Sequence, residues 1–194
     1  MNNLQQLINY LNKERVMIII TGISGSGKTT LLYKLKNSLV KQNVFYGEVD
    51  SYKIKEYEKY SFCNITEKNI LKNIAIETFK ADVIQKARHG VNMVLDYPFN
   101  HKWQEFFNYI RSEYKYTIVV VNCNSRSFDD IIRKKIVRDA DDSTRHKSLI
   151  CSRYINDTYY CISDELSDDG IKKQQELYDS GYYNVIHGQS DISI

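Results

Sequence analysis

The stretch VMIIITGISGSGKTTLLYKL, residues 16–35, joins three different patterns. Its first part, Val16 to Thr21, is a continuous apolar and β-branched run, which predicts a strand buried on both faces. A segment rich in glycine and serine follows, and the leucines after it recur at helical spacing. The stretch therefore predicts a strand, a glycine turn and a helix in direct succession.

The turn, GISGSGKT at residues 22–29, fits the pattern G-x-x-x-x-G-K-[ST] completely. Glycines let the backbone curl so that successive N–H groups point inward at a phosphate, and the N-terminus of the following helix adds its dipole. In this pattern Lys28 reaches the β- and γ-phosphates and the Thr29 hydroxyl ligates Mg²⁺. A nucleoside triphosphate site is therefore expected, formed by Gly22, Ser24, Gly25, Ser26, Gly27, Lys28, Thr29 and Thr30.

Composition and charge exclude several other classes. The chain has 194 residues, of which 42% are hydrophobic and 26% charged, and this composition is that of an ordinary globular protein. A net charge of +3 does not mark a nucleic-acid binder. The cysteines form no C-x-x-C pair, which favours unpaired thiols without a metal. No apolar run approaches the roughly 18 residues of a membrane span, and the polar start does not resemble a signal peptide, so we expect a cytoplasmic protein.

Strand and helix patterns alternate along the chain without a linker, so we expect one domain over residues 1–194. Helical spacing predicts a helix at residues 4–11 and a long one at residues 65–90, opened by a turn that Thr66 caps and closed by Gly90. Further strands are predicted at residues 43–50, 91–96 and 116–123, and a fifth at residues 182–187. This alternation predicts a parallel sheet covered on both faces, with ligands at the carboxyl ends of its strands.

Three further segments accompany the glycine turn: EVDSYKI at residues 48–54, MVLDYPF at residues 93–99 and a basic segment at residues 128–148. Together they resemble the P-loop kinases, the small phosphotransferases related to adenylate kinase. Within these, the chain looks most like the branch that contains chloramphenicol phosphotransferase, zeta-toxin-type kinases and polynucleotide kinase. The resemblance implies a three-layer α/β fold with five parallel strands ordered 2-3-1-4-5, a short lid at roughly residues 133–150, and transfer of the ATP γ-phosphate to an acceptor.

The first of these segments carries Asp50 directly after the second predicted strand. In the resembling branch an aspartate here accepts the proton of the acceptor hydroxyl, and a residue two or three positions on helps to seat the acceptor. The resemblance thus implies Asp50 as the base and Tyr52 and Lys53 as acceptor contacts. A carboxylate suits this step, because it need only orient and deprotonate a hydroxyl as a loose transition state forms. A turn aspartate is the competing interpretation, and Glu48 on the same face could share the role.

The second segment resembles the family's LDGFPR-like sequence after the third strand. It implies that Asp96 holds a Mg²⁺-bound water beside the loop, and that Pro98 and Phe99 turn the chain over the acceptor pocket. Asn100 and His101 are candidate pocket residues, with plain loop polarity as the competing interpretation. Phe99 stands where adenylate kinase has the arginine that grips an acceptor phosphate, which argues against a nucleoside monophosphate as acceptor. Tyr97 stands where motor-type ATPases have a water-activating glutamate, which favours transfer over hydrolysis.

The basic segment follows the fourth predicted strand. Lys134 and Arg138 stand four residues apart, where the family often has two arginines, of which one stacks on adenine and the other contacts the phosphates. The resemblance implies both as nucleotide ligands and Arg138 as a catalytic group. A cationic lid would stabilise charge on the γ-phosphoryl group and exclude water. Arg133 and Arg145 are alternatives in the same lid, and a solvated charged helix is the competing interpretation.

These features predict an enzyme that uses ATP and Mg²⁺ to phosphorylate an alcohol group of a small molecule or a nucleoside-like acceptor. Two alternatives stay open: a kinase acting on a hydroxyl of DNA or RNA, which the small net charge disfavours, and a nucleotide-binding switch or ATPase that transfers nothing. No membrane partner is expected, and a homodimer is compatible with the resemblance. The tyrosine-rich stretches at residues 51–62 and 152–161 are interpreted either as acceptor-stacking surfaces or as partly buried helix faces.

Overall fold

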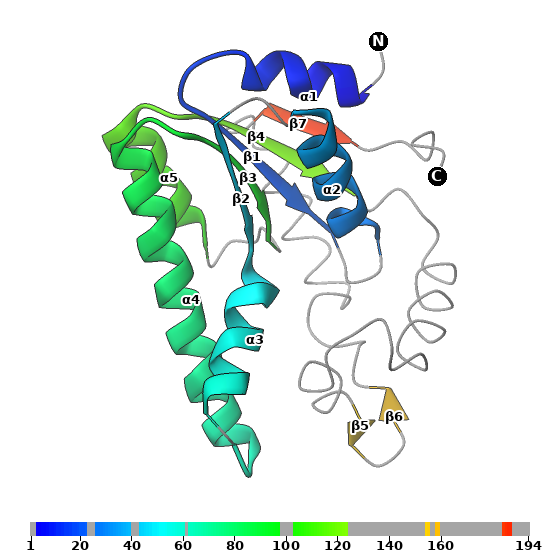
Figure 1. Ribbon diagram of the computed structural model, residues 1–194, viewed down its shortest axis with the longest axis vertical. Helices are drawn as coiled ribbons and strands as arrows, with labels where there is room; N and C mark the ends of the chain where they lie inside the picture. The colour runs from blue at the N-terminus through cyan, green and yellow to red at the C-terminus, as the bar shows by residue number, and fades with distance from the viewer. Residues whose placement is uncertain are drawn as a thin grey trace.

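A computed structural model describes residues 3–22, 26–39, 43–60, 62–97, 103–123, 154–155, 158–159 and 184–187. The helices are α1 (Asn3–Leu11), α2 (Lys28–Ser38), α3 (Val49–Lys59), α4 (Ile65–Arg88) and α5 (Gln104–Tyr114). The strands are β1 (Val16–Thr21), β2 (Val44–Glu48), β3 (Asn92–Asp96), β4 (Thr117–Asn122), β5 (Tyr154–Ile155), β6 (Thr158–Tyr159) and β7 (Asn184–His187). Figure 1 shows the helices arranged around a central sheet.

The central sheet is parallel throughout and has the strand order β2-β3-β1-β4-β7. The expected α/β class, with a parallel sheet between two layers of helices, is confirmed. β2, β3, β1 and β4 follow the predicted order, and β7 pairs with β4 at the outer edge. Because all strands run the same way, their carboxyl ends meet at one edge, where Ile20 and Glu48 are both register partners of Asp96.

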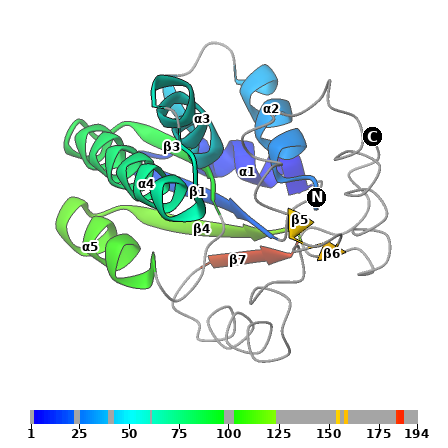
Figure 2. The ribbon, with the colours of Figure 1, turned by 90° about the horizontal axis from the view of Figure 1, so that it is seen from below.

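β1 forms the middle of two hydrophobic cores, one on each face of the sheet. Met17 and Ile19 pack with side chains of α4 and α5, whereas Val16, Ile18 and Ile20 pack with side chains of α1 and α2. Figure 2 shows these two helix pairs on opposite sides of the sheet. Burial of one such aliphatic side chain stabilises the folded state by roughly 1.5–3 kcal/mol. Every residue of β1 is buried, which confirms the prediction that this strand is buried on both faces.

The long helix α4 begins differently from the prediction. Its N-cap is Asn64, whose side-chain oxygen accepts a hydrogen bond from the Glu67 backbone N–H at 2.9 Å. Glu67 in turn accepts one from the Cys63 N–H at 2.6 Å, so the two side chains satisfy one amide of the first turn and one amide just before the helix. The prediction that Thr66 caps the helix was wrong, because the acidic residue that such a cap needs stands three positions after Asn64 and not after Thr66.

Two other segments also differ from the sequence pattern. The strand predicted over residues 43–50 ends at Glu48, and the chain turns directly into α3, so that Asp50 lies in the first turn of a helix. An acidic side chain is favourable there because it faces the positive end of the helix dipole. In the stretch 152–161, β5 and β6 pair as antiparallel strands, so neither of these pieces is a helix face.

In the part of the chain that the structure describes, no helix is both long and apolar enough to cross a membrane. Among the described cysteines, Cys63 is exposed and Cys123 buried, and neither forms a disulfide.

Candidate active site

The glycine loop leaves the carboxyl end of β1 and enters α2. Gly22 has a φ of +143° and Gly27 one of +95°, a region that strains any residue with a side chain. An added Cβ at Gly27 would meet nothing within 4 Å. The backbone conformation, and not a lack of space, therefore requires glycine at this position. Ser24 and Gly25 lie outside the described residues.

Two polar side chains turn into this loop. Lys28, the first residue of α2, donates a hydrogen bond from Nζ to the Gly22 carbonyl oxygen at 2.8 Å, so its ammonium lies across the loop. Ser26 is 7% exposed, and its buried Oγ has no hydrogen-bond partner among the described residues. A buried hydroxyl without a partner is costly unless a ligand or water satisfies it. A cation and such a hydroxyl in one loop fit a bound phosphate.

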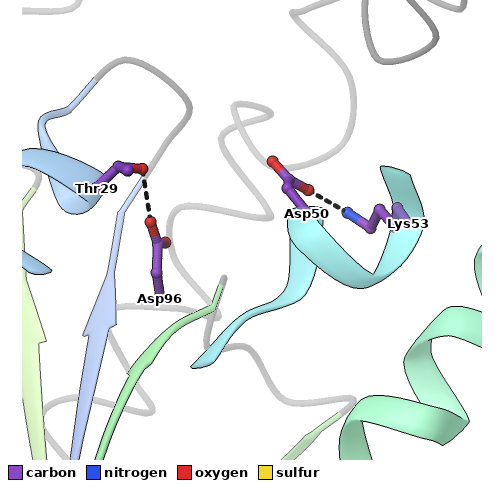
Figure 3. Close-up of polar contacts among 4 residues, drawn as sticks. All are labelled: Thr29, Asp50, Lys53 and Asp96. Atoms are coloured by element: carbon purple, nitrogen blue, oxygen red, sulfur yellow. Dashed lines mark hydrogen bonds and ion pairs between the residues drawn. The ribbon is translucent and has the colours of Figure 1, made fainter. Parts of the chain in front are cut away.

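Beside the loop, α2 and β3 meet through a hydrogen bond that Thr29 Oγ1 donates to Asp96 Oδ2 at 2.7 Å (Figure 3). Asp96 is 9% exposed. Burial raises the pKa of its carboxyl group, and the Lys28 ammonium and the Thr29 hydrogen bond act in the opposite direction. A hydroxyl and a carboxylate beside a phosphate loop are oxygen donors of the kind that Mg²⁺ uses.

The described residues contain no group of three or more His, Cys, Asp or Glu side chains that could hold a metal by themselves. Mg²⁺ usually keeps several waters and is bound by one or two protein groups together with substrate phosphates, and the Thr29 hydroxyl with the Asp96 carboxylate supplies two such groups. The residues present therefore fit Mg²⁺ held jointly with a nucleotide.

Asp50 lies across the same edge, in the first turn of α3 (Figure 3). Its Oδ1 accepts a hydrogen bond from Lys53 Nζ at 2.7 Å. The Asp50 charge is among the causes that raise the pKa values of Asp96 and Glu48, so these carboxylates act on one another at short range. The structure thus places Asp50 at the same edge as the Thr29–Asp96 pair.

Glu48 and Tyr33 form a contact that the sequence did not reveal. Glu48 stands opposite Asp96 in the β2–β3 register, and its pKa is raised first by burial and then by the Asp96 charge. A side-chain hydrogen bond with Tyr33 counteracts that rise, while the Glu48 charge raises the pKa of Tyr33. The only signal for Tyr33 was its spacing, since a residue four positions after Thr29 lies on the same helix face.

Lys53 and Tyr52, the two residues of α3 predicted to contact the acceptor, bind different partners. Lys53 faces Asp50, as described above. Tyr52 donates a hydrogen bond from its hydroxyl to Asp82 Oδ2 of α4 at 2.7 Å, and its ring packs edge-on against Phe79 at 5.3 Å. Burial, followed by the bond to Asp82, raises the pKa of Tyr52. The Tyr52 hydroxyl is therefore engaged by α4.

Comparison with known proteins gives a partial sequence match. The family described as Type II/IV secretion system protein matches residues 1–61, which include the glycine loop and amount to less than a third of the chain. No curated protein matches.

Solved structures match over more of the chain. A chain from the PezAT chromosomal toxin–antitoxin system of Streptococcus pneumoniae matches with a TM-score of 0.63 and 13% identity, over 98% of this chain and 77% of that one. A chain of the Pnkp1/Rnl/Hen1 RNA repair complex matches with a TM-score of 0.58 and 12% identity, over 86% and 46%. Deoxyadenosine kinase from M. mycoides matches with a TM-score of 0.50 and 14% identity, over 92% and 93%. The fold is that of the P-loop kinases.

In this P-loop kinase fold, the described structure brings Lys28, Thr29 and Asp96 together beside the glycine loop and places Asp50 with Lys53 across the same edge. Thr30 follows in the first turn of α2. The other predicted site residues lie outside the described residues: Pro98, Phe99, His101, Lys134 and Arg138, together with the lid at residues 133–150. The roles of these residues stay predictions.

Proposed function

We propose that this protein is a kinase that uses ATP and Mg²⁺ to phosphorylate a hydroxyl of a small molecule or a nucleoside-like acceptor. The observation that carries this proposal is the meeting, at one sheet edge, of a phosphate loop, the Thr29–Asp96 pair and the carboxylate of Asp50. In this proposal residues 1–194 form one kinase domain, closed by a lid at roughly residues 133–150.

The nucleotide side would hold the triphosphate through the loop amides, the α2 N-terminus and Lys28. Thr29 and Asp96 would hold Mg²⁺, the hydroxyl directly and the carboxylate through a bound water. Mg²⁺, when bound, neutralises charge on the β- and γ-phosphate oxygens. Lys28 would leave the Gly22 carbonyl for the phosphates, and Lys134 and Arg138 of the proposed lid would contact the nucleotide from the other side.

On the acceptor side, Asp50 would accept the proton of the acceptor hydroxyl. As this proton leaves, the hydroxyl oxygen bonds to the γ-phosphorus, and the bond from that phosphorus to the bridging oxygen breaks, so that ADP departs with the electron pair. Most of the rate enhancement would come from positioning and charge stabilisation. Lys53, Pro98, Phe99 and His101 would line the acceptor site, and Tyr52 would contribute its ring, because its hydroxyl is bonded to Asp82.

The position of Tyr97 supports transfer over hydrolysis. Its ring is 5% exposed and stacks on Phe79, with 5.8 Å between the ring centres. The residue after Asp96 is thus a core aromatic and not an acid that could activate water. The likeness to a chain of an RNA repair complex favours a second candidate, a kinase that acts on the terminal hydroxyl of a nucleic acid.

The test is a transfer screen with γ-labelled ATP and Mg²⁺ over nucleosides, nucleotides, sugars, antibiotics, and DNA and RNA oligomers with a free 5′-hydroxyl. Asp50→Asn removes the base, and Asp82→Asn is the matched control on α4. The proposal predicts label on an acceptor with the wild type and Asp82→Asn, but not with Asp50→Asn. Label found only in inorganic phosphate would instead indicate an ATPase or a switch.

A further inference from the structure

An ion pair covers the proposed base. Lys53 Nζ lies 2.7 Å from Asp50 Oδ1, one helical turn further along α3. The Lys53 side chain is 18% exposed and that of Asp50 is 49% exposed, so the lysine reaches the carboxylate from the protein side. Figure 3 shows the second carboxylate oxygen of Asp50 turned away from Lys53. One carboxylate oxygen of Asp50 therefore contacts Lys53, and the other oxygen points away from it.

This contact weakens the base that it touches. An ammonium group stabilises the ionised form of a carboxylate, which makes the carboxylate a weaker base, and it occupies one lone pair of the oxygen that it contacts. An ion pair in which one partner is half exposed is also held weakly, because water screens it and the long side chain loses freedom. A stronger anion beside Lys53 could therefore take over the ammonium and leave Asp50 able to accept a proton.

We infer that Lys53 restrains Asp50 until an acceptor that carries its own anionic group, such as a phosphate, sulfate or carboxylate, draws the ammonium away. The inference rests on the proposed function, in which Asp50 is the base. It identifies the acceptor class as an anionic alcohol. A neutral alcohol supplies no charge that could replace Asp50 as the partner of Lys53, so it would leave the base restrained.

A second lysine adds positive charge in the helix next to α3. Lys68 of α4 is 6% exposed, and its ammonium lies 5.4 Å from the ring centre of Tyr57 and 5.3 Å from that of Phe62. Tyr57 lies in the field of Asp50, because the Asp50 charge is among the causes that raise its pKa. Figure 1 shows α3 and the first half of α4 extending side by side beyond the carboxyl ends of the strands.

The restraint would prevent the loss of ATP in the absence of an acceptor. Hydrolysis needs a base that takes a proton from water while the water oxygen bonds to the γ-phosphorus and the bond to ADP breaks. With Lys53 on Asp50, that proton transfer is disfavoured. An anionic acceptor would therefore bring both the attacking hydroxyl and the group that releases the base.

The first experiment measures ATP hydrolysis without any acceptor. Lys53→Met should raise the rate about tenfold, a small part of the 10² to 10⁴ that a general base contributes. Lys53→Arg retains the ion pair and should not show this rise, and adding Asp50→Asn to Lys53→Met should abolish it. Lys55→Met is the matched control, since Lys55 lies over the Tyr52 ring and not on Asp50. A Lys53→Met protein that melts like the wild type and hydrolyses ATP no faster would overturn the inference.

The second experiment tests the anionic class directly, with sodium sulfate against sodium chloride at equal ionic strength. Sulfate at low millimolar concentration should raise wild-type hydrolysis several-fold and leave Lys53→Met unchanged. No difference between the two salts would overturn the anionic-acceptor inference. If acceptor labelling depends on Asp50 while these two experiments fail, the inference fails alone. If neither acceptor labelling nor ATP hydrolysis occurs, the proposed function and this inference both fail.

Discussion

Two hydrogen bonds of equal length, 2.7 Å, lie on the two sides of the candidate site and differ in their surroundings. Asp96 is 9% exposed, although its partner Thr29 is exposed, and their bond joins a helix start to the end of a central strand. Asp50–Lys53 lies within one turn of an outer helix, and its carboxylate is half exposed. A polar contact strengthens in a low-dielectric interior and weakens in water. The carboxylate on the proposed nucleotide side is therefore held in drier surroundings, whereas the contact on the proposed acceptor side can exchange partners more readily.

On the proposed nucleotide side, the largest expected effect comes from Lys28→Met. Removing one preorganised charged donor typically costs about 10² to 10³ in rate, so kcat/KM for ATP should fall at least about 100-fold. Steady-state kinetics with varied ATP measures this. Lys13→Met, at the amino end of β1, is the control and should stay near the wild-type value. A loss equal for both variants would contradict the assignment of Lys28 to the phosphates.

A smaller loss is expected for Thr29→Val, which keeps the shape of the side chain and removes the hydroxyl. Because Thr29 is proposed to ligate Mg²⁺ directly, kcat should fall by about 10 to 100-fold and the Mg²⁺ concentration for half-maximal rate should rise. Thr29→Ser retains the hydroxyl and should stay within a few-fold of the wild type. Chelation of Mg²⁺ with EDTA should abolish transfer in all three proteins, and transfer that survives EDTA would exclude a metal role.

Asp96→Asn should stabilise the ligand-free protein by a few degrees in Tm at pH 7. Burial raises the pKa of Asp96, so the folded state holds this proton more tightly than the unfolded state does. Stability is therefore lost as the pH rises from the ordinary carboxyl range through the folded-state pKa. The two melting temperatures should converge below about pH 3, where aspartate is protonated in both states. Equal melting temperatures of the two proteins at pH 7 would show that burial of the ionised Asp96 does not destabilise the fold.

The smallest effect is expected for Tyr52→Phe on the acceptor side. It removes the hydrogen bond to Asp82 and should lower the free energy of unfolding by about 1 kcal/mol, measured by urea denaturation. If only the ring contacts the acceptor, KM for the acceptor should stay within about twofold. A tenfold rise in that KM, without loss of stability, would mean that the hydroxyl itself binds the acceptor.

The sequence predicted most where backbone geometry restricts the choice of residues. The β-branched run of β1 allowed little but a buried strand, and Gly27 marks a conformation that other residues adopt only with strain. The hydrogen bond between Thr29 and Asp96 follows from the same topology, because a parallel sheet brings the end of β3 beside the loop after β1.

Contacts made by long side chains were not predictable in the same way. The direction of Tyr52 depends on Asp82, thirty positions along the chain, and Tyr33 reaches Glu48 from another element. The start of α3 was also missed, because its residues alternate lysine, glutamate and tyrosine without a clear apolar stripe. In such stretches tertiary packing decides the structure more than local preference does.

The central claim is that Asp50 and the glycine loop act on one γ-phosphate. A single-turnover reaction with γ-labelled ATP and the acceptor identified by the screen tests it most directly, together with the ATP dissociation constant of each protein. We expect Asp50→Asn to bind ATP within about twofold of the wild type and to slow the appearance of labelled acceptor by 10² to 10⁴. Transfer at the wild-type rate by Asp50→Asn would contradict the account.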